Sequence, residues 1–335
     1  MSGPVRSESA RHWRYDGLPG LELLRARYVR HTFPRHSHES FLLGSVISGV
    51  ERMRVREGVV DAGPGEVILF NPEQPHAARS KDPDGWAYIA LYPAAELVRE
   101  IAREVSTVRG TPGFREVLVD DPGTAALIPG VYQAAEAGNA LAADSLLRVA
   151  VARLLGSHGG SPASSRTPRT SGARTAALAR ALLEERMTEP PSLERLALEL
   201  GTSPFALLRA FKAQYGMPPH TWLTDARVRR ARGLLDSGTA PSEVAVAVGF
   251  SDQPHLNRHF TRIVGVPPGA YRKERAGRAR SLGASRPSGA GPARSPNPLP
   301  PQGRGPWGSR GAVPGDGNRD GDGTPRAGRK NVQER

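Results

Sequence analysis

Three histidines in the first quarter of the chain are placed so that their rings could bind one ion or ligand together. His36 and His38 stand two residues apart in "FPRHSHES", so on an extended strand they would share one face, and His76 follows a turn in "FNPEQPHA". Imidazole nitrogens bind divalent transition metals, and they also exchange hydrogen bonds with organic ligands. From the residues alone three interpretations stay open: a metal site, a small-molecule pocket with Trp86, Tyr88 and Tyr92 as walls, or structural histidines in a barrel.

A second set of polar side chains stands in "SDQPHLNRHF", in the C-terminal half of the chain. Leu256 and Phe260 are four residues apart and would face a core, which leaves Gln253, Asn257 and Arg258 outward on a helix. Amide and guanidinium groups hydrogen-bond the edges of bases in the DNA major groove, and a helix N-terminus can meet a phosphate. The pattern therefore predicts a helix that contacts DNA.

The elements that would position these side chains occur twice. "LALELGTSPFALLRAFKAQYGMPPHTW" is followed about 49 residues later by "VAVAVGFSDQPHLNRHFTRIVGVPPGAY". Gly201 and Gly249 would each end a first helix, and Ser203 would cap the second helix of the first copy. In the second copy Ser251 or Asp252 would do the same. The repeated unit is a helix-turn-helix, and two such copies argue against an ordinary helical bundle.

The stretch from Thr175 to Arg275 closely resembles the DNA-binding domain of AraC/XylS-type bacterial transcription regulators, most specifically in "AVGF", "LNRHF" and "GVPPGAYR". This resemblance implies two helix-turn-helix units joined by a central helix at about 219–236, with both recognition helices in major grooves on one DNA face. Leu208 departs from the commoner polar residue, so a contact with a thymine methyl is the alternative there. The DNA-binding residues that we infer are Ser203, Phe205, Leu208, Arg209, Lys212, Ser251, Gln253, Pro254, Asn257 and Arg258.

Residues 21–93 alternate short apolar runs with Gly and Pro turns, as in "DAGPGEVILFNPEQPH", which is typical of a small barrel or jelly roll. This region resembles the cupin-type barrel that often precedes such DNA-binding domains, which implies a sensor. Cupin metal sites usually place a glutamate four or five residues after the second histidine, where Leu42 and Leu43 stand. We therefore expect no metal and no cofactor. The expected effector-binding residues are His36, His38, His76, Trp86 and Tyr88.

The expected fold class is α+β multidomain: an N-terminal cupin-like β-barrel with following helices, then an all-α domain of two helix-turn-helix units. Composition and periodicity divide the chain into six segments. They are a flexible N-terminus (1–20), the sensor barrel (21–93), a helical dimerisation and coupling segment (94–155), a linker (156–174), the DNA-binding domain (175–275) and a disordered basic tail (276–335).

The charge and composition limit the functional classes. The 335 residues carry a net charge of +13, but residues 276–335 contain eleven Lys and Arg against four Asp and Glu, so net charge alone is weak support for a folded DNA-binding surface. The absence of cysteine excludes disulfides and thiolate metal sites. No apolar run approaches the length that spans a membrane, and the N-terminal stretch has no apolar core of signal-peptide type, so we expect a cytoplasmic protein.

We expect a sequence-specific, effector-responsive transcription regulator that is not an enzyme. Its expected partners are double-stranded operator or promoter DNA, a small-molecule effector, RNA polymerase if it activates, and a second copy in a homodimer, with no membrane partner. A metal-dependent cupin enzyme fused to a DNA-binding module is the alternative function. A third hypothesis is non-specific DNA compaction by the basic tail.

Overall fold

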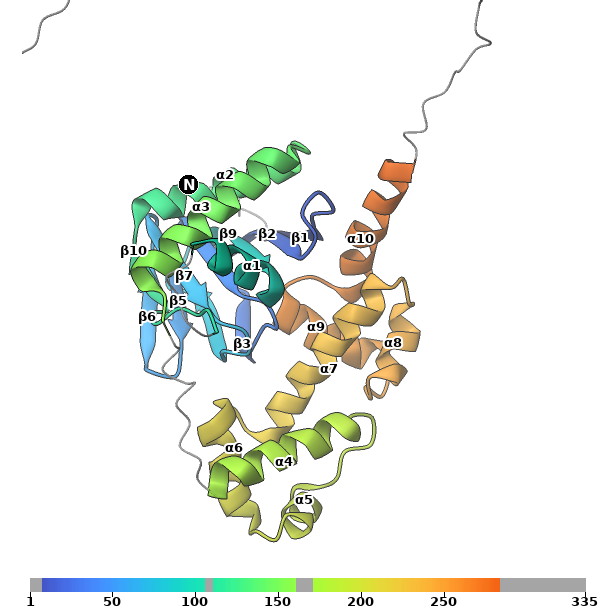
Figure 1. Cartoon of the computed structure of the whole chain (residues 1–335). Coiled ribbons are helices and arrows are strands. Elements are labelled where there is room, and N and C mark those ends of the chain that lie inside the picture. The colour runs from blue at the N-terminus through green and yellow to red at the C-terminus, as the bar shows by residue number, and fades with distance from the viewer. Residues whose placement is uncertain (1–7, 106–110, 161–170, 284–335) are drawn as a thin grey trace, which may run out of the picture. The chain divides into compact units, whose positions relative to one another are not determined.

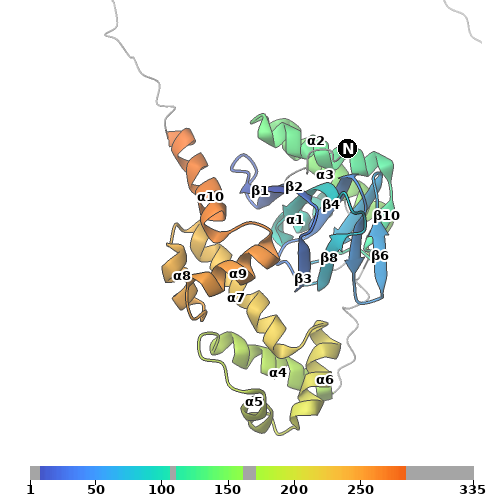
Figure 2. The same cartoon turned by 180° about the vertical axis from the view of Figure 1, so that it is seen from behind.

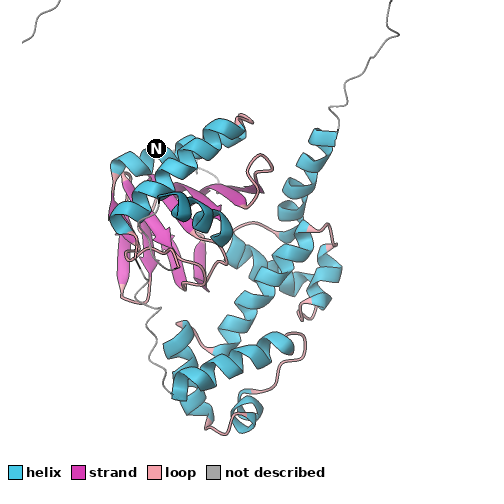
Figure 3. Cartoon of the chain, viewed as in Figure 1, coloured by secondary structure: helices cyan, strands magenta, loops and turns pink. Residues whose placement is uncertain are grey.

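The computed structural model describes residues 8–105, 111–160 and 171–283 (Figure 1). Strands and three helices make up the N-terminal part, and the part from residue 171 onward is entirely helical (Figure 3). This order confirms the α+β class expected from the sequence.

The strands form two antiparallel sheets. One sheet has the order β1-β2-β9-β4-β7-β10, and the other has the order β3-β8-β5-β6, of which β3, β8 and β6 are labelled in Figure 2. The strands are β1 (Ser9–Arg14), β2 (Leu21–Tyr28), β3 (Thr32–His36), β4 (Leu42–Ser48), β5 (Glu51–Arg54), β6 (Val59–Ala62), β7 (Glu66–Phe70), β8 (His76–Ser80), β9 (Trp86–Pro93) and β10 (Leu118–Asp120).

Strand β9 shows why these segments are apolar almost throughout. Successive side chains of a strand point to opposite faces. Tyr88 and Tyr92 therefore join the core between the two sheets, whereas Ile89 and Leu91 join a second core on the other face. That second core is closed by α1 (Ala95–Val105), α2 (Pro122–Glu136) and α3 (Ala140–His158), which cover the larger sheet.

Two strands lie outside the bounds that the sequence predicted for the barrel. The expected flexible N-terminus contains β1, which pairs with β2 from Ser9 opposite Arg27 to Arg14 opposite Glu22. Trp13 is fully buried there, and its burial stabilises the added strand. The expected helical segment contains β10, three residues long, whose partner β7 lies about 50 residues earlier. Residues 1–7 lie outside the described part of the chain.

The helical part consists of seven helices in the described range. They are α4 (Ser171–Glu185), α5 (Leu193–Glu199), α6 (Pro204–Tyr215), α7 (Pro219–Asp236), α8 (Pro241–Ala247), α9 (Gln253–Val264) and α10 (Pro268–Gly283). The bounds of α7 match the central helix predicted at 219–236. Gly201 and Gly249 have φ values of 62° and 87°, which confirms the left-handed turns predicted from glycine at these two positions.

Helix α7 serves two hydrophobic cores. Its first half contributes Trp222 and Ala226 to the core formed with α4, α5 and α6. Its second half contributes Ala231 and Leu235 to the core formed with α8 and α9, where Tyr271 of α10 also packs. Each helix-turn-helix unit therefore has its own core, and one continuous helix fixes the spacing between them.

The predicted linker and tail fall only partly within the described residues. Helix α3 ends at His158 and α4 begins at Ser171, so part of the linker expected at 156–174 is helical, and residues 161–170 lie outside the description. Helix α10 continues to Gly283, beyond the boundary predicted at 275, and residues 284–335 lie outside the description. None of the described helices combines the length and the apolar character needed to cross a bilayer.

Candidate functional sites

Both predicted recognition helices begin with a side-chain cap. The hydroxyl of Ser203 accepts a hydrogen bond from the backbone N–H of Ala206 at 3.2 Å, as the sequence predicted for α6. In α9 the cap is Asp252, whose carboxylate accepts from the N–H of His255 at 2.7 Å. Ser251 is not the cap; its hydroxyl lies 3.0 Å from Nδ1 of His255.

The outward face of α6 carries an exposed aromatic side chain beside a cation. Phe205 is 69% exposed, and the Arg209 guanidinium carbon lies 4.9 Å from the centre of its ring. Lys212 is also exposed. Leu208 was predicted to point outward, but its side chain is half-buried. It lines a hollow together with Leu183 and other apolar residues. The helix turn that places Phe205 and Arg209 outward thus turns Leu208 toward that hollow.

Helix α9 presents polar and charged groups at its N-terminal end. Gln253, Pro254 and Arg258 are exposed, as predicted, whereas Asn257 is half-buried. Arg258 forms no ion pair with any residue in the described part of the chain, so its charge is available to an external anion or base. The face opposite is anchored by Leu256, Phe260 and Ile263, which are buried.

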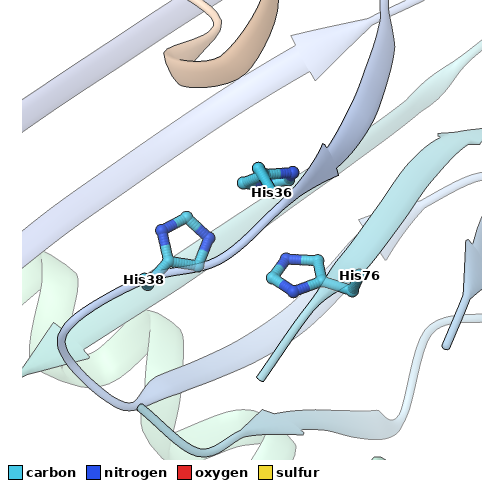
Figure 4. Close-up of side chains that lie close together, drawn as sticks. All are labelled: His36, His38 and His76. Carbon is cyan, nitrogen blue, oxygen red and sulfur yellow. The ribbon is translucent and has the colours of Figure 1, made fainter. Parts of the chain in front are cut away.

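The three histidines singled out from the sequence lie together in the strand domain. Figure 4 shows their rings around a common space, with His36 and His38 from one segment and His76 from β8. His36 pairs directly with His76 across β3 and β8. The ring centre of His38 lies 4.9 Å from the ring centre of His36 and 5.2 Å from that of His76. His38 stands two residues past the end of β3, not on the strand as predicted, yet it reaches the same space.

Hydrogen bonds to the backbone fix the tautomer of two of these rings. Nδ1 of His36 lies 2.8 Å from the carbonyl oxygen of Pro34, and Nδ1 of His76 lies 3.1 Å from that of Gln74. A carbonyl oxygen only accepts, so each Nδ1 carries the proton and donates it. The Nε2 atoms of both rings are then left with a free lone pair while the rings are neutral.

Burial keeps the three rings neutral at ordinary pH. It lowers the pKa of His36 below the usual value, and it lowers the pKa of His38 and of His76 well below that value. The neighbouring rings add to the effect for His38 and His76, because a positive charge on one disfavours a charge on the next. Their lone pairs are therefore not taken up by protons near neutral pH.

These rings line a cavity of about 50 Å³, which has room for a few water molecules. Tyr88 lines it as predicted, but Trp86 does not: it is fully buried in the core between the sheets. Sequence reasoning missed Glu51, which also lines the cavity. Its carboxylate is buried, and burial raises the pKa of Glu51 to about 7.

Helix α7 supplies part of the cavity wall within the unit formed by residues 1–286. The hydroxyl of Ser37 donates a hydrogen bond to Oδ2 of Asp225 at 2.9 Å, and Nη1 of Arg229 donates to that hydroxyl at 3.0 Å. Arg229 also pairs with Asp225 directly. The same helix that joins the two helix-turn-helix units therefore contacts the residue between His36 and His38.

Comparisons with known proteins match both parts of the chain. An AraC-like ligand binding domain matches residues 18–151, and a helix-turn-helix domain matches residues 196–274. The uncharacterized HTH-type transcriptional regulator YbfI of Bacillus subtilis is 27% identical over 237 residues, which cover 70% of this chain and 86% of that protein. The MmsAB operon regulatory protein of Pseudomonas aeruginosa is 25% identical over 256 residues, covering 72% of this chain and 78% of that protein.

Among solved structures, ToxT from Vibrio cholerae O395 matches with a TM-score of 0.50 and 13% identity, covering 78% of this chain and 100% of that chain. At this identity the match concerns the fold. It agrees with the order found here, a strand domain with helices followed by a helical domain.

Proposed function

Because the chain belongs to the AraC family of DNA-binding transcription regulators, we propose that α6 and α9 are its DNA-reading helices and that the barrel cavity binds its effector. The matched models place a ligand-binding domain before the helix-turn-helix domain, and the relatives that match most of this chain are named as regulators. The enzyme alternative is therefore not retained.

The exposed N-terminal turns of the two helices support the DNA-contacting role. We propose that Arg209, Gln253 and Arg258 reach base edges or phosphates, since all three are exposed. Phe205 would contact apolar base atoms such as a thymine methyl. We assign the remaining predicted residues to supporting roles: phosphate contact near the helix starts or along α6, or packing beneath the contact face. They are Ser203, Leu208, Lys212, Ser251, Pro254 and Asn257.

One observation carries the effector proposal: a single cavity is lined both by buried polar groups of the barrel and by α7. His36, His76 and Glu51 bring hydrogen-bonding groups to it, and Tyr88 and Tyr92 bring aromatic surface. Buried polar groups that converge on apolar walls are typical of small-molecule sites. The cavity volume of about 50 Å³ indicates a small occupant, unless the walls move apart on binding.

We propose that occupancy is coupled to DNA binding through α7. An occupant of the cavity lies beside Asp225 and Arg229, which hydrogen-bond Ser37 of the barrel. A ligand that favours one arrangement of this contact shifts the population of DNA-binding conformations, and DNA shifts ligand affinity by the same factor.

We also propose a second copy of the chain and RNA polymerase as partners. A homodimer is supported by two exposed apolar side chains on α3, Leu141 at 79% and Val149 at 49%. RNA polymerase is the partner that an activator would need. We also propose that the protein acts in the cytoplasm, where its DNA targets lie.

The effector proposal is tested with a compound panel and two matched variants of the full chain. Leu42 and Leu43 are adjacent on β4, but Leu42 lines the cavity and Leu43 packs on the opposite face of the sheet. A compound that raises the melting temperature of the unsubstituted chain should change its operator affinity by about fivefold or more. Both effects should vanish in Leu42→Phe and persist in Leu43→Phe. Equal effects in both variants would place the ligand elsewhere and overturn the proposal.

A further inference from the structure

We propose that His36, His38 and His76 bind a first-row divalent transition metal ion in the barrel cavity. One nitrogen from each ring lies within 4.8 Å of the others. The inference deepens the proposed function, since it names the chemistry of the same cavity, and it rests on that function only for its regulatory consequence. It also replaces the earlier expectation that the barrel binds no metal.

The geometry needs only a small adjustment to close around an ion. A metal–nitrogen bond of about 2.0–2.1 Å in tetrahedral geometry places ligand nitrogens about 3.3 Å apart. His36 and His76 already face each other as a cross-strand pair, with ring centres 4.4 Å apart. His38 is half-buried beyond the end of its strand, so rotation of its side chain can bring the third nitrogen in.

The tautomers are those that a metal site requires. His36 and His76 each donate Nδ1–H to a backbone carbonyl, of Pro34 and Gln74 respectively. Metal-binding histidines usually donate the second ring N–H in this way, which orients the ring and raises the basicity of the other nitrogen. The ring of His76 is held further by stacking on Phe70, with centres 3.8 Å apart.

The polar groups around the cavity leave room for a cation. Glu51 and Asp225 both line this cavity. Oε2 of Glu51 and Oδ1 of Asp225 are buried and have no hydrogen-bond partner in the described structure. A buried oxygen without a partner costs free energy, which a nearby dication offsets. Arg229 and Arg232 also line the cavity, but both already pair with carboxylates, those of Asp225 and Glu22.

Three imidazoles are a sufficient ligand set without the glutamate whose absence argued against a metal. Zinc sites with three protein ligands keep a fourth position for water or another small ligand, and imidazole suits Zn²⁺, Cu²⁺, Ni²⁺ and Fe²⁺ alike. An ion bound here would leave its open position toward the cavity. Purely structural histidines, the alternative, would give no metal binding.

The test uses the full chain after chelator treatment and removal of the chelator. Zn²⁺ is titrated by calorimetry, metal content is measured after desalting, and Co²⁺ is added separately because its visible absorption reports nitrogen coordination. We expect one ion per chain and a Co²⁺ spectrum of low-symmetry, nitrogen-bound type. No binding, or binding without these spectral bands, would overturn the inference.

Three variants locate the ion. His76→Gln and His38→Phe each remove one ligand, and His38→Phe preserves an aromatic ring against Tyr92. His12→Gln is the matched control, because His12 is buried and lines the same cavity outside the three-histidine cluster. We expect affinity to fall more than about tenfold in the first two and to change less than about twofold in the control. If His76→Gln fails to fold, His38→Phe alone decides; unchanged affinity in it contradicts the assignment.

The same samples separate the failure of this inference from failure of the proposed function. If no metal binds but a compound from the thermal panel still acts through Leu42, the cavity is an effector site and only the metal assignment falls. If the metal binds at the three histidines without changing operator affinity, the site stands and its regulatory role falls.

Discussion

The imidazole rings of His36 and His76 lie 4.4 Å apart, centre to centre, and each donates its Nδ1–H to the carbonyl oxygen two residues before it. The register of β3 and β8 sets the first relationship, because it pairs these two residues directly. The local backbone sets the second. Together they leave two Nε2 lone pairs at one end of the barrel interior, beside His38.

We predict that Zn²⁺ stabilises the full chain against heat. A ligand that binds only the folded state at about 100 times its dissociation constant adds about 2.7 kcal/mol to the free energy of unfolding. A rise in melting temperature, measured by scanning calorimetry, is the expected result. At the same Zn²⁺ concentration the variant His38→Phe should show a clearly smaller rise, because its affinity is lower, whereas an equal rise in it would mean that the ion binds elsewhere.

Glu51 should make stability fall as pH rises. Its folded-state pKa of about 7 lies above the ordinary 4.5, so between these values the folded state holds a proton that the unfolded state has lost. Stability from this group is complete below pH 4.5 and declines until pH passes 7, by about 3 kcal/mol.

Urea denaturation at pH 5 and pH 8 checks the Glu51 prediction. The difference in unfolding free energy between the unsubstituted chain and Glu51→Gln should change by about 3 kcal/mol between the two pH values, in favour of the variant at pH 8. Glu57→Gln removes an exposed carboxylate in the same hairpin and serves as control. A pH dependence that is identical in all three proteins would contradict the burial argument.

Replacing Arg258 should weaken operator binding. The side chain is exposed on α9 without an ion-pair partner in the described chain, so Arg258→Ala should cost about 1–3 kcal/mol of binding free energy if it reads a base. Fluorescence anisotropy on operator and scrambled DNA gives the comparison. Arg230→Ala, an exposed arginine on α7, matches the change in charge. Equal losses on both DNAs would show a phosphate contact instead.

Phe205 should contribute mainly to operator affinity, and Leu208 mainly to the stability of the fold. Phe205 is 69% exposed, so Phe205→Ala should reduce operator affinity and change the unfolding free energy by less than about 1 kcal/mol. Leu208 is half-buried against an apolar hollow, so Leu208→Ala should destabilise by about 1–2 kcal/mol. Denaturation and anisotropy on both variants give the answer. A larger stability loss at Phe205 than at Leu208 would reverse the assignment.

Much of the helical domain could be predicted from the sequence, because residues close together in the chain determine where its helices begin and end. The cap at Ser203 and the turn glycines Gly201 and Gly249 could be predicted from residues that are close in sequence, whereas the limits of α7 were implied by the family resemblance. The sequence could not decide between Ser251 and Asp252 as the cap of α9, because both residue types suit that position. The choice depends on the residue at which the helical backbone begins.

Less of the barrel could be predicted from the sequence, because its strands pair with segments that are far apart in the chain. Strand β10 is three residues long and gains its structure from β7, about 50 residues away. Glu51 is the first residue of "ERMR", a pattern typical of a strand with exposed charges. Its side chain is buried because β5 pairs with β8 in the second sheet. Trp86 shares a strand face with Tyr88, yet it packs in the core between the sheets and does not line the cavity.

The most direct test of the central claim is in-vitro selection of genomic fragments bound by the full chain at near-physiological salt. Two recognition helices fixed by α7 should select a bipartite motif whose halves lie about ten base pairs apart. The double variant Arg209→Ala/Arg258→Ala should lose that motif. Fragments recovered without any shared motif, or one motif bound equally by the double variant, would contradict the assignment of α6 and α9 as the DNA-reading helices.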